Sequence, residues 1–357
     1  MRTGVTYLPL HGGKAPKWLF DRMVKLSREI VRFIVIEFGP DELLSRLSDP
    51  VWFQALGSLL GFDWHSSGLT TTTLGALKEG IKGLEKELGI FIAGGKGHTA
   101  RTTPEQITSW GNDIQISPNT LVRISRLTAK VDSVGLQDGY DLYHHNIIFT
   151  KNGNWVVIQQ GMNPEKRYAR RYHWANRASL NFVVDPHKAI VSPKKGKVLN
   201  MVTKPSIPSQ KAQLELIKQS PDYLLRELQK VKELIMPPHH EVYMDLDPKR
   251  IYKYIVSVHE NNPKNYESLI LSPGAGRATI RGLALLAELL FGAPPSFNDP
   301  VRYSFAHGGK DGHPYPVDRL RYDKTITFLH DVVERLKIED IEKSRALKRL
   351  SRFQSEN

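Results

Sequence analysis

Apolar side chains recur every three or four positions through most of the first third of the chain. This period is typical of amphipathic helices, and it is clearest over residues 17–38, where Gly39 and Pro40 then end the pattern. The same period predicts further helices over residues 50–60, 74–88, 104–110 and 119–134. We therefore expect an amino-terminal helical domain over residues 1–135.

The pattern changes to an alternation of polar and apolar positions over residues 140–162, which are rich in aromatic and β-branched side chains. Asn152 and Gly153 lie in its middle, and this dipeptide is the strongest local indication of a two-residue hairpin turn. We expect strands over residues 142–150 and 155–160 and a further strand within residues 181–191. Residues 136–204 are thus predicted to form a β-sheet domain.

Helical periodicity returns after a proline-containing linker at residues 205–208. The helices expected in this part of the chain are 210–219, 221–235, 248–260, 265–271, 278–291, 319–336 and 338–350. We assign residues 205–338 to a third domain and residues 339–357 to a basic carboxy-terminal helix or tail. The expected fold class is α+β, predominantly α-helical, with a small central antiparallel sheet inserted.

A short glycine turn separates two of the expected helices. Residues 273–276 read Pro-Gly-Ala-Gly, and a helical pattern begins directly after them. Two glycines at this spacing permit a tight turn and leave backbone amides exposed at the positive end of the next helix, where a phosphate oxygen can bind. The alternative is an ordinary corner between two helices. The nucleic-acid contacts expected here are Gly274, Ala275, Gly276, Arg277 and Thr279.

Composition favours a polyanionic partner. The 357 residues carry 50 Lys and Arg against 37 Asp and Glu, a net charge of +13, which is typical of nucleic-acid-binding proteins, although a protein with dispersed basic charge has the same balance. The absence of cysteine excludes disulfides and thiolate metal sites. No apolar run reaches the length of a membrane span, and the amino terminus has no signal-peptide pattern. We expect a cytoplasmic protein whose partner is DNA, with no membrane contact and no oligomeric state predicted.

The glycine turn and the residues after it resemble the helix-hairpin-helix superfamily of DNA glycosylases. In that superfamily a Pro-Gly-x-Gly turn opens a helix, and an Asp follows that helix at the start of another. Asp299, before Pro300, has this position here. The resemblance implies a helix-hairpin-helix carboxy-terminal domain in which Asp299 stabilises the cationic sugar as a base departs, or activates the nucleophile. The alternative is that Asp299 only caps a helix.

The amine nucleophile of the lyase members has no counterpart at its usual place. Those members carry a Lys two residues after the second glycine, where this chain has Ala278. The string His-Gly-Gly-Lys occurs twice, ending at Lys14 and at Lys310, and these two lysines are our candidate replacements. The alternative is a pair of glycine-rich turns, each with an incidental lysine.

The central strands carry a second concentration of candidate residues. Buried amide side chains are costly unless paired, and they can bond a base edge, while Arg interleaved with aromatic residues suits stacking on bases and neutralising phosphates. Because side chains alternate along a strand, neighbours such as His144 and His145 face opposite sides. The alternative is the polar rim of a sheet. The expected phosphate contacts are Arg170 and Arg171, and the expected base pocket comprises His144, His145, Gln159, Gln160, Tyr172, His173 and Trp174.

Strings spread along almost the whole chain resemble a further family. They lie at residues 8–16, 159–162, 170–174, 271–287 and 304–310. They are similar to a prokaryotic, mainly archaeal and thermophilic family known as domain of unknown function seven hundred sixty-three. The resemblance implies an intracellular protein of a thermophile and brings no established activity.

Three functional hypotheses remain open at this point. The first is a DNA-repair glycosylase, with or without AP-lyase activity, that flips and excises a damaged base such as an oxidised or deaminated pyrimidine and needs no cofactor. The second is a structure-specific nuclease that uses a divalent metal ion, although no familiar ligand spacing is present. The third is a nucleic-acid binder without catalysis. The metal ligands considered are Asp138, Asp141, His144 and His145, or residues 239–241.

Overall fold

The computed structural model describes residues 15–62, 66–165, 167–177, 180–192, 195–231, 247–301 and 319–355. Within these residues the protein is mixed α and β and mostly helical, with one five-stranded antiparallel sheet. This confirms the coarse fold class expected from the sequence.

The first helices begin and end close to their predicted positions. The helix α1 (Lys17–Phe38) is followed by Gly39 at φ +86°, a conformation that favours glycine. Asp49 caps α3 (Pro50–Leu59) by accepting a hydrogen bond from the Val51 amide at 2.9 Å. The other helices of this part are α2 (Pro40–Ser48), α4 (Gly68–Ile81), α5 (Glu85–Leu88), α6 (His98–Arg101), α7 (Thr103–Ser109) and α8 (Pro118–Lys130).

Two of the predicted helices are wrong in extent. The single helix expected over residues 74–88 is divided into α4 and α5, because Gly83 between them has φ +82°. The helix expected over residues 119–134 stops being α-helical at Lys130 and continues as a π-helical turn, η1 (Val131–Gly135). Such turns widen the helix locally and are frequent at functional sites.

The sheet has the strand order β1-β3-β4-β5-β6, with every neighbouring pair antiparallel. The predicted hairpin is confirmed, and Gly153 in its turn has φ +85°. The strands β1 and β5 were not predicted, and β6 is shorter than the segment expected at 181–191. The strands of this sheet are β1 (Ile90–Lys96), β3 (Asp141–Thr150), β4 (Trp155–Asn163), β5 (Tyr168–Ala175) and β6 (Ala189–Val191), and a second sheet pairs β2 (Leu136–Gln137) with β7 (Leu199–Asn200).

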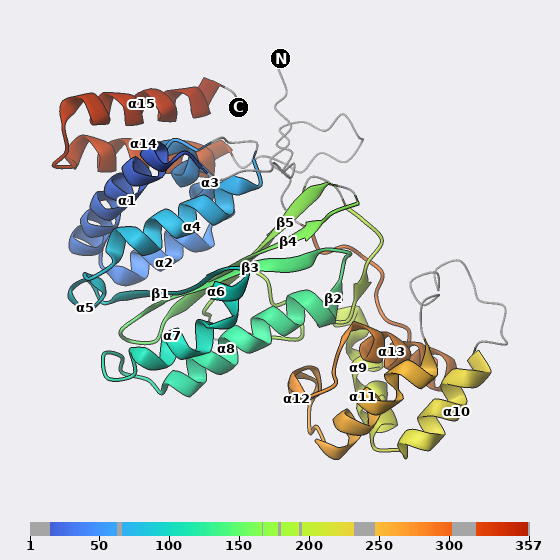
Figure 1. Cartoon of the computed structure of the whole chain (residues 1–357). Helices are drawn as coiled ribbons and strands as arrows, with labels where there is room; N and C mark the ends of the chain where they lie inside the picture. Colours follow the sequence, from blue (N-terminus) through green and yellow to red (C-terminus); the bar gives the residue numbers. More distant parts are fainter. Residues whose placement is uncertain are drawn as a thin grey trace.

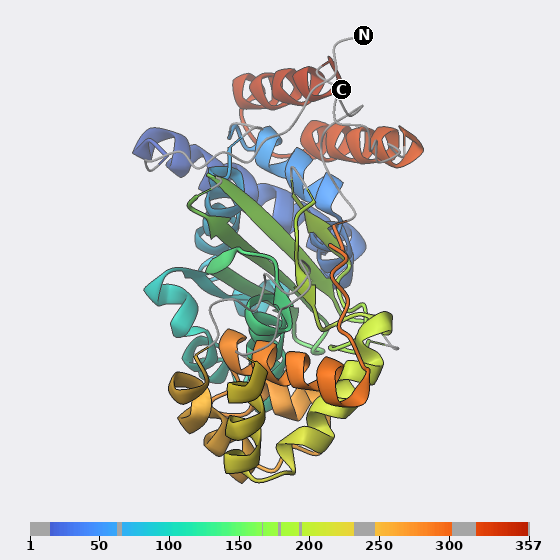
Figure 2. The same cartoon turned by 90° about the vertical axis from the view of Figure 1, so that its right-hand side faces the viewer.

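Helices cover both faces of the five-stranded sheet (Figures 1 and 2). On one face, α1 to α4 pack together with α14 (Arg319–Arg335) and α15 (Asp340–Ser355), and this core includes Ile92, Ile148 and Ile158 from the strands. We call it the bundle face. The other face carries Phe149 and Val157 and packs against α8, so we call it the α8 face. Helices α1 to α4 therefore share one core with α14 and α15, while α7 and α8 pack on the other face.

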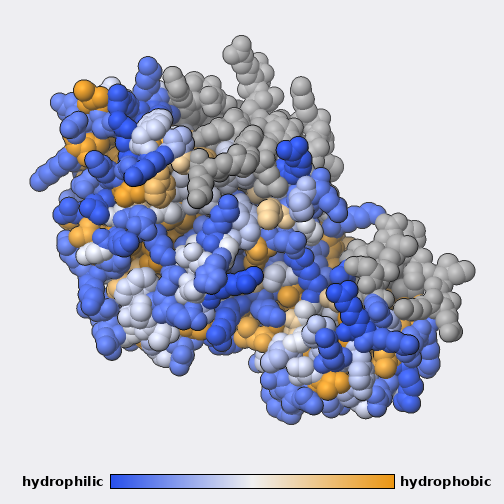
Figure 3. Space-filling view, in the orientation of Figure 1, coloured by the Kyte–Doolittle hydropathy of each residue, from blue (hydrophilic) through white to orange (hydrophobic). Residues whose placement is uncertain are grey.

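A smaller lobe continues from the α8 face and projects from the main body (Figures 1 and 3). Capping residues determine where two of its helices begin. Asp247 accepts a hydrogen bond from the Lys249 amide at the start of α11, and Asn265 forms a capping box with Ser268 at the start of α12. The lobe comprises α9 (Ile207–Ile217), α10 (Pro221–Val231), α11 (Pro248–Glu260), α12 (Tyr266–Leu271) and α13 (Arg277–Phe291). Among the described helices of the whole chain, none combines the length and the apolar character that crossing a membrane requires.

Candidate functional site

The two glycines of the turn between α12 and α13 differ in conformation and in surroundings. Gly274 has φ +84°, and a Cβ atom there would lie 2.5 Å from the carbonyl oxygen of Tyr254 in α11. Gly276 has φ −113°, and a Cβ atom there would meet no atom within 4 Å. The first glycine therefore permits close packing of the turn on α11, while the second lies beside open space.

Side chains from α8 and η1 hold the other side of this turn. Lys130 donates to the carbonyl oxygen of Ala275 at 2.8 Å, and burial lowers the pKa of Lys130. The Arg277 guanidinium donates to the carbonyl oxygens of Ser133 at 2.6 Å and Tyr140 at 2.9 Å. The buried Thr279 hydroxyl donates to the carbonyl oxygen of Gly274 at 2.9 Å. The turn is thus fixed between α11 and α8.

Four consecutive backbone amides at this turn have no hydrogen-bond partner within the described part of the chain. They belong to residues 276–279, and α13 has no capping side chain and no acidic residue in its first turn. Ala275 was also expected to contact a phosphate, but its amide donates to the carbonyl oxygen of Ser272 at 3.1 Å. Of the expected contacts, Gly276, Arg277 and Thr279 therefore offer open amides among the described residues, and Ala275 does not.

Asp299 lies in a buried ion pair with Arg170. The Arg170 guanidinium donates to both of its carboxylate oxygens, at 2.8 Å and 3.2 Å, and the amides of Gly196 and Val301 donate to it at 2.8 Å and 3.1 Å. Only 2% of the Asp299 side chain is exposed. The alternative considered from the sequence, that Asp299 caps a helix, stays a prediction, because the residues after Val301 lie outside the described part of the chain.

Arg170 also joins Asp299 to a second buried carboxylate. Its guanidinium donates to Asp138 at 2.9 Å, and the Tyr172 hydroxyl donates to the same Asp138 oxygen at 2.7 Å. Burial raises the pKa of Asp138, and the Arg170 charge and these hydrogen bonds oppose that rise. This cluster links the loop before β3, the strand β5 and the segment after α13.

The residues expected to form one base pocket are divided between the two faces of the sheet. On the α8 face, His145 contacts Gln159 at 2.7 Å and Ser125 at 2.8 Å. Gln159 in turn donates to Asp132 at 2.6 Å, and so does the Trp174 indole at 2.8 Å. The opposite orientations of His144 and His145, expected from strand alternation, are confirmed, and the same alternation separates Gln159 from Gln160.

Asp132 is at the centre of this network, and it was not among the site residues predicted from the sequence. It lies in η1, is fully buried, and accepts from His187 as well as from Gln159 and Trp174. A signal was present, because Asp132 interrupts an apolar helix face between Val131 and Val134. A carboxylate at such a position needs several donors to offset its desolvation.

On the bundle face, Arg171 and several uncharged polar groups are buried together. Arg171 donates to His173 and to Gln54, each at 2.9 Å, and burial lowers its pKa to about 9. Both ring nitrogens of His144 and the side-chain oxygen of Gln160 have no partner within the described residues. Burial lowers the pKa of His144 to about 3, so this ring is neutral at pH 7.

Several candidates from the sequence lie outside the described residues or are not brought together. Lys14, Lys310 and the possible metal ligands at 239–241 lie outside them. Of the remaining metal candidates, Asp138 pairs with Arg170, and Asp141 pairs with Arg277. In the described segments, no group of three or more His, Cys, Asp or Glu side chains is arranged to hold a metal ion.

Together these features define a mixed α/β protein with an antiparallel sheet between two helical layers and an uncapped helix start beside basic side chains. The chain belongs to the family described as "Protein of unknown function (DUF763)", whose model matches residues 4–317. No curated protein and no solved structure matches the chain. The archaeal origin and the likeness to helix-hairpin-helix glycosylases stay predictions.

Proposed function

We propose that this protein binds DNA and holds a backbone phosphate at the start of α13. The observation that carries the proposal is the run of four amides, residues 276–279, without partners among the described residues. Amides at a helix start carry the positive end of the helix dipole and are well suited to an anion. The open space beside Gly276 leaves room for a phosphate oxygen to approach.

The charges around the turn support the same proposal. Lys130 and Arg277 contact the turn itself, and Arg126 lies exposed on α8 one helical turn before Lys130. With a net charge of +13, the whole chain attracts a polyanion. Contacts of this kind are made to the sugar–phosphate backbone, so we expect binding with little sequence preference and a strong dependence on salt.

The substitution Gly276→Asp tests this proposal with the fold preserved. Aspartate is a preferred N-cap residue, so it should bond the open amides and stabilise α13 while repelling a phosphate. Fluorescence anisotropy with duplex DNA measures the affinity. We expect an affinity at least tenfold lower, and a slope of log K against log salt that is smaller in magnitude by about 1. Gly276→Ala is the matched control and should bind as the unmodified protein does. Equal binding by the two variants would contradict the proposal.

Base excision is a second and narrower candidate, favoured by polar groups of the bundle face that have no partner among the described residues. The ring nitrogens of His144 and the amide oxygens of Asn146 and Gln160 offer the donors and acceptors that a flipped base requires. This candidate does not assign the chemistry to Asp299, whose carboxylate accepts four hydrogen bonds. It predicts that a panel of single-lesion duplexes is cleaved after alkali treatment in the presence of EDTA.

The same panel separates the hypotheses considered from the sequence. Borohydride trapping would identify a lysine nucleophile, and cleavage that stops in EDTA would identify a metal-dependent nuclease. If every lesion duplex is bound and remains intact, the protein is a binder and the excision candidate is wrong.

A further inference from the structure

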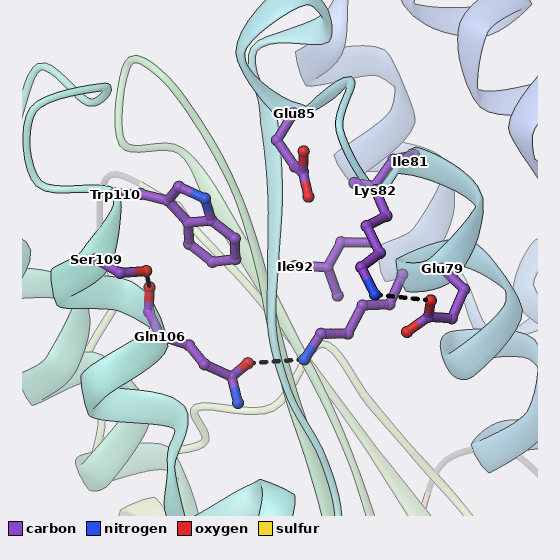
Figure 4. A pocket seen from close by; sticks show the side chains of 9 residues that line it. Glu79, Ile81, Lys82, Glu85, Ile92, Gln106, Ser109 and Trp110 are labelled. Atoms are coloured by element: carbon purple, nitrogen blue, oxygen red, sulfur yellow. Dashed lines mark hydrogen bonds and ion pairs between the residues drawn. The ribbon is translucent and has the colours of Figure 1, made fainter.

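A cavity of about 250 Å³ lies between α4 and α7 at the outer edge of β1, away from the glycine turn. Ser109 and Trp110 lie on one side of the strand, and Ile81 and Lys82 lie on the other (Figure 4). The turn at the start of α13 contacts the opposite end of α8, whose 13 residues span about 20 Å. The residues that line the cavity are Lys78, Glu79, Ile81, Lys82, Glu85, Ile92, Gln106, Ser109 and Trp110.

The edge strand offers a donor and an acceptor to this cavity. Because β1 has a neighbour on one side only among the described strands, the backbone groups of alternate residues point away from the sheet. At Gly94 these groups are occupied: its amide donates to Gln106 at 3.0 Å, and its carbonyl oxygen accepts from Lys78 at 2.7 Å. Two residues earlier, the outward amide and carbonyl of Ile92 have no partner among the described residues, and Ile92 lines the cavity.

Apolar side chains line the cavity on both sides of this edge. The Trp110 ring packs against Phe91 and Phe149, at centroid distances of 5.5 Å and 6.0 Å, which fix its orientation. The opposite wall is formed by Ile81 and the side chain of Ile92. An aromatic wall, an apolar wall and an outward donor–acceptor pair between them together suit a planar ring.

The charges at the cavity balance. Lys78 and Lys82 oppose Glu79 and Glu85, and Lys82 lies 3.5 Å from Glu79. Lys78 is further held by Gln106 at 2.7 Å, which closes one end of the cavity. A charged ligand finds no excess of opposite charge in this lining. The volume is also below the roughly 300–1,000 Å³ of pockets for drug-sized ligands, which limits the occupant to a small ring system.

We propose that this cavity binds an uncharged planar nitrogen heterocycle, a nucleobase or its nucleoside. Its donor–acceptor edge pairs with the backbone amide and carbonyl of Ile92, and its ring lies against Trp110. The bound base lies beside the edge strand β1, in line with the sheet, with α7 on one face of the sheet and α4 on the other. This site is independent of the phosphate contact proposed at α13.

Isothermal titration calorimetry with adenine, cytosine, uracil, adenosine and adenosine monophosphate tests the proposal. We expect at least one base and its nucleoside to bind, and the nucleotide to bind more weakly, because its phosphate meets no surplus of positive charge. Ser109→Phe fills the cavity from an exposed position and should weaken binding at least tenfold. Thr108→Phe, on the exposed side of the same helix and outside the cavity, is the control and should change affinity less than twofold.

Three results would overturn the proposal. The first is that no base or nucleoside binds at millimolar concentration. The second is that Ser109→Phe and Thr108→Phe bind equally well. The third is that binding is lost in Gln160→Leu and kept in Ser109→Phe, which would place the base at the bundle face. Because Gly276→Asp should leave base binding unchanged, failure of the phosphate proposal and failure of this one are distinguishable.

Discussion

Asp132 and Asp299 are buried carboxylates, and each accepts several hydrogen bonds. Asp132 accepts hydrogen bonds from three side chains of the α8 face, and Asp299 accepts them from Arg170 and two backbone amides. A buried carboxylate is tolerated only when such donors replace its hydration. Asp299 could be singled out in the sequence by its place after a helix. Its ion-pair partner, Arg170, is 129 residues away, and no local pattern indicates that the two residues pair.

At this scale we predict that Asp299→Ala lowers the free energy of unfolding by about 3–5 kcal/mol, because it leaves the buried Arg170 with one carboxylate partner fewer. Urea unfolding followed by circular dichroism measures the change. Glu260→Ala, at an exposed position at the end of α11, is the control and should stay within about 0.5 kcal/mol. A stability of Asp299→Ala equal to that of the control would show that the ion pair does not stabilise the fold.

At the scale of elements, most helices were predicted, and four strands, β1, β2, β5 and β7, were not. The period of α1 or α11 is a local pattern, so its bounds follow from the sequence. The strands β1 and β5 are buried on both faces, as β3 and β4 are, but no Asn-Gly turn adjoins them to mark a hairpin. The basic helix α15 was expected as a carboxy-terminal helix or tail outside the other domains, but it packs on α3 with Ala346 and Leu350 buried.

The packing of α15 predicts that Leu350→Ala lowers the free energy of unfolding by about 2–5 kcal/mol, since it removes a buried side chain from the core of the bundle face. Lys348→Ala, exposed on the same helix, should change it by less than about 0.5 kcal/mol. Differential scanning calorimetry of the two variants measures the difference. Equal melting temperatures would mean that α15 does not contribute to this core.

At the scale of the whole molecule, the sheet lies between two helical layers and encloses neutral histidines. Burial lowers the pKa of His144 to about 3 and that of His145 to about 4. An unfolded chain protonates these rings below about pH 6.5. Between that pH and about pH 4 the unfolded state therefore binds more protons than the folded state, and stability is lost as the pH falls.

We therefore predict that the free energy of unfolding falls by about 1.4 kcal/mol per pH unit for each of these histidines between about pH 6.5 and pH 4. In His144→Gln this slope should be smaller by about 1.4 kcal/mol per pH unit, because the ring at this position no longer titrates in the unfolded state. Denaturant unfolding at a series of pH values measures it. An unchanged slope in the variant would show that His144 is protonated in the folded protein.

The sequence by itself determined the helical segments, the hairpin at Gly153, the glycine turn before α13 and the basic charge, because each depends on neighbouring residues or on composition alone. Only the tertiary structure decided which polar side chains meet. Arg170 and Arg171 are adjacent in the chain, yet Arg170 pairs with carboxylates on the α8 face and Arg171 contacts uncharged groups on the bundle face. Strand alternation is local and predicts that they separate. Their partners come from distant segments, and only the packing of both helical layers on the sheet brings these together.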